Sequence, residues 1–157
     1  MRKPSVDTLI KQFQIIVDTR EQTPYKFSNS ISRGLKCGDY TVAYNGKSYE
    51  DKIVVERKSN VSELFAFSGS QRDRFCKELE KMKDVKYKYL LMEFELMDIV
   101  NSQPPGLLEP SIVFSTLCSF AIRYQIPFLF CGNRNNARGI MYKLFEFFIK
   151  YEVLKIK

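Results

Sequence analysis

Segments with strand character alternate with segments with helix character along this chain, and this alternation constrains the fold more than any other feature of the sequence. The first part is rich in strands, because FQIIVDT (13–19), GDYTVAY (38–44) and IVVERK (53–58) are apolar or alternate between apolar and polar residues. The pair Asn45-Gly46 favours a tight turn between two strands. The chain therefore begins with a sheet, and a short segment around Ile31 to Leu35 interrupts the loop that follows the first strand.

The rest of the chain continues as strand and helix in turn. The spacing of Phe75, Leu79 and Met82 places apolar side chains on one side of a helix. Helices are predicted over 61–67, 71–84, 112–125 and 136–154, strands over 86–96 and 126–132, and a loop with three prolines over 102–111. This order predicts an α/β fold with a mixed central β-sheet flanked by helices. Since the sequence contains no repeat, low-complexity tract or linker, we expect one domain over 1–157 with a core of about 13–150.

Composition narrows the class of protein and the kind of metal site. The chain has no histidine, and its four cysteines are scattered without a CxxC pair, so a metal would be held by oxygen ligands. The net charge of +7 favours a polyanionic partner, nucleic acid before an acidic membrane surface. No apolar run is long enough to span a bilayer, and the N-terminus does not have the pattern of a signal peptide. We therefore expect a cytoplasmic protein, or a nuclear one in a eukaryote.

The strand over 53–58 ends in three charged residues, which is unusual for a segment that enters a core. Because side chains alternate along a strand, Glu56 and Lys58 should lie on one face and Arg57 on the other. A carboxylate beside an amine suits a hydrolytic metal site, in which the amine stabilises charge near the attacked phosphate. One carboxylate alone is a weak Mg²⁺ site, so Asp39 on the neighbouring strand is the expected second ligand and Asp18 a third.

Three short motifs occur together in this region: VDTRE (17–21), GDY (38–40) and VVERKS (54–59). In this order and at these spacings they resemble the signature of the XPF-type nuclease domain, a family with the restriction-endonuclease-like PD-(D/E)XK fold. The resemblance extends from Ile15 to about Lys150. It implies a metal-dependent DNA endonuclease that uses Mg²⁺ or Mn²⁺, with branched, flap or forked DNA as candidate substrates.

The resemblance also implies roles for individual residues. Asp39 and Glu56 would be the principal metal ligands, and Lys58 would act on the water and the transition state. The remaining members of the catalytic cluster would be Asp18, Arg20, Glu21 and Arg57, the last without an assigned role. The family commonly has a further aspartate after the ERK motif, where this chain has Ser62 followed by Glu63, so either Glu63 substitutes through a shift of one residue or this contribution is missing.

Many members of this family bind DNA through appended helix-hairpin-helix modules, for which we expect no room in these 157 residues. The DNA grip would then come from its own basic surface, a homodimer or a partner protein. Arg72 and Arg74 are candidate phosphate contacts, although a solvated helix face explains them more simply. The aromatic residues Phe145, Phe147, Phe148 and Tyr151 are too widely distributed around one helix for all to be buried in a monomer.

Two other functions remain open at this point. The chain could be a catalytically silent DNA-binding or scaffolding subunit, although such subunits typically lose the acidic residues that this chain keeps. It could also be an RNA-directed nuclease of the same fold.

Overall fold

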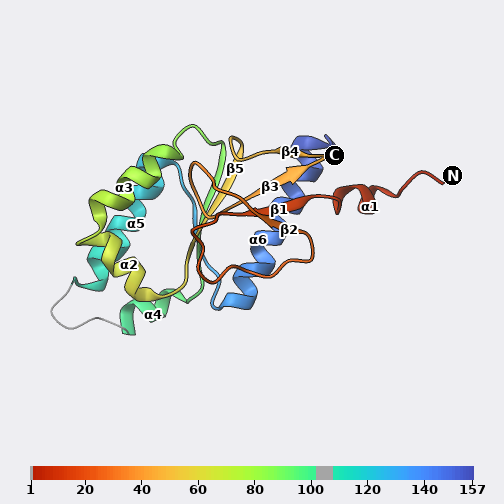
Figure 1. Cartoon of the computed structure of the whole chain (residues 1–157). Helices are drawn as coiled ribbons and strands as arrows, with labels where there is room; N and C mark the ends of the chain where they lie inside the picture. Colours follow the sequence, from red (N-terminus) through yellow and green to blue (C-terminus); the bar gives the residue numbers. More distant parts are fainter. Residues whose placement is uncertain (1, 102–107) are drawn as a thin grey trace.

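The computed structural model describes residues 2–101 and 108–157. A central sheet separates two helical layers, and a short N-terminal arm extends away from this body (Figure 1). The sheet has the strand order β2-β1-β3-β5-β6-β7, with β4 attached to β3. Parallel and antiparallel neighbours both occur, so the predicted mixed α/β architecture is confirmed.

The sheet consists of an antiparallel centre with parallel pairs at both ends. β1 pairs in parallel with β2 and antiparallel with β3, whereas β5, β6 and β7 run parallel to one another. The strand bounds are β1 Gln14–Val17, β2 Ser30–Ser32, β3 Tyr40–Tyr44, β4 Lys47–Ser48, β5 Ile53–Lys58, β6 Tyr87–Met92 and β7 Phe128–Phe130. The predicted Asn45-Gly46 turn is present, with φ angles of 50° and 76° at its two residues, but it joins β3 to the short strand β4, which was not predicted, rather than to β5. These positive values are those of the turn that matches the twist of a hairpin.

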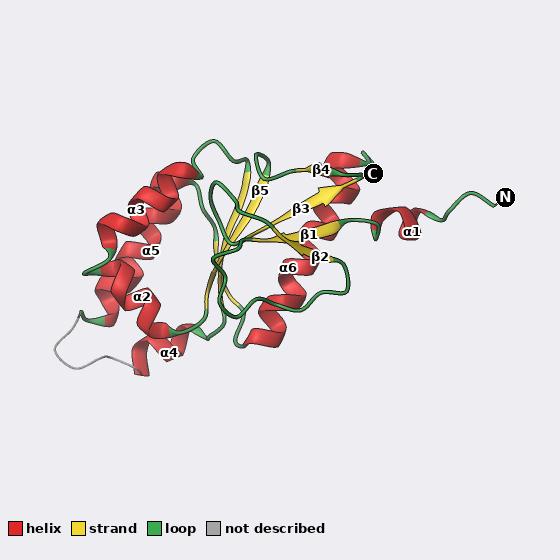
Figure 2. Ribbon diagram, in the orientation of Figure 1, coloured by secondary structure: helices red, strands yellow, loops and turns green. Residues whose placement is uncertain are grey.

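Helices cover both faces of the sheet. α2, α3, α4 and α5 form one layer and α6 forms the other (Figure 2). Their bounds are α1 Val6–Ile10, α2 Val61–Ser68, α3 Arg72–Lys81, α4 Leu96–Asn101, α5 Pro110–Tyr124 and α6 Arg134–Phe148, which continues as the π-helical turn η1 Ile149–Val153. None of the helices in the described part of the chain is long and apolar enough to cross a membrane.

Strand β5 contributes to the core on both sides of the sheet. Val54 packs into the cluster formed with α2, α3 and α5, whereas Ile53 and Val55 pack into the cluster formed with α6. The alternation of side chains along the strand produces this division. The same alternation then determines where the three charged residues at the end of β5 lie.

The observed elements differ from the predicted ones mainly at their ends. The strand predicted over 86–96 ends at Met92, and Leu96 instead begins α4, which was not predicted. The helix predicted over 136–154 begins two residues earlier, at Arg134, because the side chain of Asn133 caps its N-terminus. It is α-helical only to Phe148. Residues 102–107 of the predicted loop over 102–111 lie outside the described residues.

Candidate active site

The antiparallel pairing of β3 and β5 brings Asp39 and Glu56 together. Tyr40 lies opposite Val55, and the backbone N–H of Asp39 donates to the carbonyl of Val55 at 2.9 Å. The backbone N–H of Arg57 in turn donates to Oδ2 of Asp39 at 2.8 Å. The carboxylate of Asp39 is therefore held at the end of β5, beside Glu56, as the strand order predicted.

These two carboxylates line a cavity of about 390 Å³ between the sheet and helices α2 and α3. Lys58 also lines it, and its Nζ lies 3.3 Å from Oε1 of Glu56. The charged residues in the lining are Asp18, Arg20, Asp39, Glu56, Lys58, Glu63, Arg74 and Glu78. Six of the predicted site residues thus meet at one cavity, although they are contributed by segments more than 50 residues apart.

Burial of two carboxylates so close together has an electrostatic cost. Burial raises the pKa of Asp39 well above its usual value, and the charge of Glu56 raises it further. Burial also raises the pKa of Glu56, while the neighbouring Lys58 opposes this increase. A cation placed between the two carboxylates would remove this cost, so the pair is suited to hold one.

The carboxylates available at the cavity fit an ion such as Mg²⁺, which keeps some of its water molecules, better than an ion that protein ligands surround completely. Across residues 2–101 and 108–157, no three acidic, cysteine or histidine side chains converge into a preformed metal cage. Mg²⁺ usually binds through one or two carboxylates and keeps several water molecules. Asp39 and Glu56 match that requirement.

Asp18 lines the cavity, but its carboxylate already accepts several hydrogen bonds. Oδ1 accepts from the backbone N–H of Leu35 at 2.8 Å, and Oδ2 accepts from Nε of Arg20 at 2.7 Å. These contacts fix the loop before β3 onto the end of β1. Arg20 is 62% exposed at the mouth of the cavity, where it is accessible to a ligand.

Arg57 lies on the opposite face of the sheet, as the alternation along β5 predicted. Its guanidinium pairs with Glu21 at 3.0 Å and with Glu93 at 2.8 Å, and the three side chains are only 6%, 12% and 7% exposed. Burial opposes the charge of Arg57, but its hydrogen bond to Glu93 and the charge of Glu21 raise its pKa above the usual value. Arg57 and Glu21 therefore form an ion pair on the face of the sheet opposite the cavity, and neither lines the cavity.

Three residues of this buried cluster were not predicted as site residues. The hydroxyl of Tyr25 donates to Glu93 at 2.5 Å, and the guanidinium of Arg134 lies over the ring of Tyr25 and pairs with Glu93 at 3.5 Å. Glu93 follows the buried strand β6, which runs parallel to β5 with Met92 opposite Lys58. Its place next to the end of β5 could have been inferred from that pairing, whereas the loop residue Tyr25 and the helix residue Arg134 have no such pattern.

The two arginines predicted to contact DNA have different environments. Arg74 lines the cavity. Arg72 instead donates to Thr116 of α5 at 3.1 Å and lies over the ring of Phe120, so it joins two helices. Its position agrees with the simpler interpretation as a residue of a helix face.

The two residues after the ERK motif that the sequence singles out have different environments. Ser62 is exposed, whereas Glu63 lines the cavity and accepts a hydrogen bond from the hydroxyl of Ser59 at 2.6 Å. Replacement of the family's aspartate by Glu63 stays a prediction.

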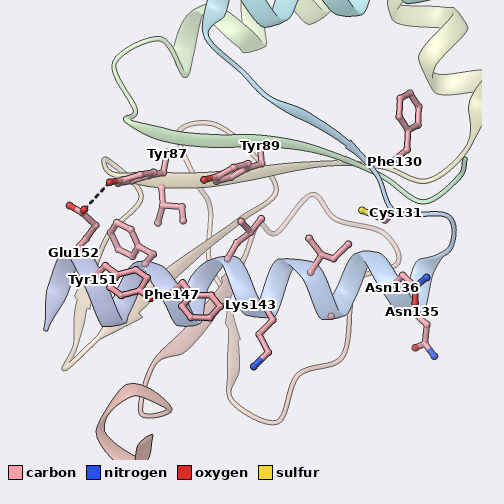
Figure 3. Close-up of a pocket in the computed structure, with 15 residues that line it drawn as sticks. Tyr87, Tyr89, Phe130, Cys131, Asn135, Asn136, Lys143, Phe147, Tyr151 and Glu152 are labelled. Carbon is pink, nitrogen blue, oxygen red and sulfur yellow. Dashed lines mark hydrogen bonds between the residues drawn. The ribbon is translucent and has the colours of Figure 1, made fainter. Parts of the chain in front are cut away.

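A second concave surface lies on the other side of the sheet. A groove of about 790 Å³ separates β6 from α6 and η1. Tyr87 and Tyr89 face Phe147 and Tyr151 across it (Figure 3). Phe147 and Tyr151 stack on each other and are 45% and 48% exposed, so this end of the helical segment presents apolar rings to solvent.

Comparisons with known proteins show the family and the fold of the chain. Residues 17–144 match the sequence profile of the ERCC4 domain. Two structures of XPF from Aeropyrum pernix are similar in fold, each at 17% sequence identity. The first has a TM-score of 0.60, and the match covers 85% of this chain and 59% of the XPF chain. The second, in complex with DNA, has a TM-score of 0.62, and the match covers 88% of this chain and 66% of the XPF chain. The chain thus spans less than two thirds of either XPF chain, and no curated protein sequence matches it. Because the profile match covers most of its length and includes every motif of the cavity, this chain belongs to the ERCC4 domain family.

Proposed function

We propose that this chain is a DNA endonuclease that hydrolyses phosphodiester bonds with the help of a divalent cation, Mg²⁺ or Mn²⁺. The observation that carries this proposal is the arrangement of Asp39, Glu56 and Lys58 around one cavity. Two buried carboxylates with raised pKa values next to an ammonium group have little value for stability alone. They are suited to a cation and a phosphate that arrive from solvent.

Each group of the cavity has a separate task in this proposal. The cation, when bound, supplies Lewis-acid chemistry for the attack of water on phosphorus. Asp39 and Glu56 hold it, and the backbone N–H of Arg57 keeps the carboxylate of Asp39 in place. Lys58 places positive charge where negative charge develops on the phosphate oxygens.

DNA is the proposed polyanion, and the residues that would contact its backbone are Arg20 and Arg74 at the cavity. The net charge of +7 supports binding to phosphates in general. The similar XPF structure in complex with DNA supports DNA in particular.

The proposed nuclease is also a homodimer, with the groove between β6 and α6 as the contact surface. Exposed, stacked rings beside an apolar groove are typical of an interface. A second copy is the simplest occupant, because most oligomers are symmetric and use the same patch on both subunits.

The activity is tested by cleavage of labelled single-stranded, linear, flap and forked DNAs, with RNAs of matched shape, in Mg²⁺ or Mn²⁺. Glu56→Gln and Asp39→Asn, checked for folding, serve as inactive controls. Cleavage by the wild type that both variants lose is the expected result. Equal DNA binding by all three proteins without any cleavage would favour the silent subunit, and preferential cleavage of RNA would favour the RNA-directed nuclease.

The dimer is tested by sedimentation equilibrium of the wild type and of Phe147→Glu. The wild type should sediment as a dimer and the variant as a monomer, since the new charge would be buried in the interface. The exposed Ile122→Glu on α5 is the matched control and should leave the dimer intact. A monomeric wild type would reject the homodimer and leave a partner protein as the occupant of the groove.

A further inference from the structure

The ammonium group of Lys58 lies against two aromatic rings that belong to none of the three sequence motifs. Its Nζ is 4.6 Å from the ring centroid of Phe75 and 5.5 Å from that of Phe67. The two rings stack with centroids 4.3 Å apart. The ammonium is therefore in contact with the carboxylate of Glu56 and with a pair of phenyl rings.

The rings form a rigid support. Phe67 belongs to α2 and Phe75 to α3, and both are buried. Phe120 of α5 also packs against them, with centroids 6.1 Å and 5.8 Å away, so the two rings lie in the core between three helices. Lysine has a long flexible side chain, and contact with fixed rings limits the positions that its charged end visits.

Aromatic rings attract the ammonium group of a lysine without accepting conventional hydrogen bonds from it. A second carboxylate in their place would accept such hydrogen bonds and occupy more of the N–H groups. The ring face interacts with the ammonium through its quadrupole, and the interaction is strongest at desolvated positions. Among the described residues, Glu56 is the one hydrogen-bond partner of the Lys58 ammonium. The other N–H groups are thereby left for a phosphate oxygen or a water molecule in the cavity.

We propose that Phe75, together with Phe67, is a positioning residue that holds the ammonium of Lys58 over the cavity. This inference rests on the proposed nuclease function, because it assigns the rings a role through Lys58. The alternative is that the two rings merely fill the core between α2, α3 and α5. If the rings position Lys58, replacement of Phe75 by an aliphatic residue should lower the cleavage rate. If they only fill the core, the same replacement should affect stability and leave the cleavage rate unchanged.

Single-turnover kinetics of DNA cleavage test the proposal with Phe75→Leu, Phe75→Tyr and Phe120→Leu. Phe75→Leu should lower the rate constant at saturating enzyme by about three- to thirtyfold, with the enzyme concentration that gives half of this rate unchanged. Phe75→Tyr should restore the rate, since it returns an aromatic face. Phe120→Leu removes a ring from the same cluster without contact to Lys58, so it should lower stability but leave the rate unchanged.

A rate for Phe75→Leu equal to that of the wild type would overturn the proposal. So would an equal loss in Phe120→Leu, which would indicate packing alone. Failure of the wild type to cut any DNA would overturn the proposed function, whereas cleavage that is indifferent to Phe75→Leu would overturn only the positioning role.

A measurement without metal or DNA tests the contact itself. In the NMR spectrum of the metal-free protein, the Lys58 ε-methylene signal, identified by its loss in Lys58→Arg, should be shifted upfield by the ring current. The shift should persist in Phe120→Leu and decrease in Phe75→Leu. An unshifted signal in the wild type would show that the ammonium does not rest on the rings, and the proposal would then be wrong.

Discussion

Three consecutive residues at the end of β5 have three separate environments. Glu56 faces a second carboxylate in the cavity, Arg57 is buried in an ion-pair cluster on the opposite face, and Lys58 rests on two phenyl rings. The faces follow from strand alternation and could be predicted from the sequence. The partners could not, because Glu21 and Glu93 each lie 36 residues from Arg57 along the chain.

The buried cluster around Arg57 should contribute strongly to stability. Arg57→Met would leave Glu21 and Glu93 without their common partner, and loss of one member of a buried ion pair costs about 3–5 kcal/mol. Urea unfolding should show a decrease of that size in the free energy of unfolding. Lys81→Met, which removes an exposed pair with Glu78, should cost at most about 1 kcal/mol. Similar losses in both variants would contradict the structural role given to Arg57.

At the scale of elements, strands were easier to predict than the ends of helices. β3 and β5 follow from the patterns of their apolar residues, and their pairing assembles the site. α4 was missed because its six residues, Leu96–Asn101, are too few to establish a helical period. The change from α-helix to π-helix after Phe148 was also missed, because the apolar pattern continues through residues 149–154 without a break.

Two glycines should respond in opposite directions to alanine. Gly46 has a φ of 76° in the hairpin turn, which strains any residue with a Cβ, so Gly46→Ala should cost about 1–2 kcal/mol. Gly139 lies inside α6 with open space around its Cβ position, so Gly139→Ala should gain about 0.5–1 kcal/mol. Thermal unfolding of both variants measures the difference. A stabilised Gly46→Ala would contradict the turn geometry.

The whole molecule has two concave surfaces on opposite sides of one sheet. The polar cavity lies between the sheet and the layer of α2 and α3, and the apolar groove lies beside α6. This separation would allow a dimer to form while both cavities remain open to DNA. The sequence predicted a basic protein that binds nucleic acid, but it did not separate Arg74, which lines the cavity, from Arg72, which contacts Thr116 and Phe120.

The salt dependence of DNA binding tests that distinction. Arg20→Ala and Arg74→Ala should each reduce the slope of log affinity against log salt by about 0.9, since each would remove one phosphate contact. Arg72→Ala should leave the slope unchanged, because Arg72 is bound to Thr116 and Phe120. Fluorescence anisotropy with a labelled duplex measures all three. A reduced slope for Arg72→Ala alone would place the DNA on another surface.

The most direct test of the account is calorimetric titration of Mn²⁺ into the metal-free wild type, Asp39→Asn and Glu56→Gln. The account predicts that the wild type binds the ion and that each variant, with one of the two carboxylates neutralised, loses this binding while remaining folded. Equal binding by all three proteins would show that the ion is held elsewhere, and it would contradict the assignment of Asp39 and Glu56 as the metal site.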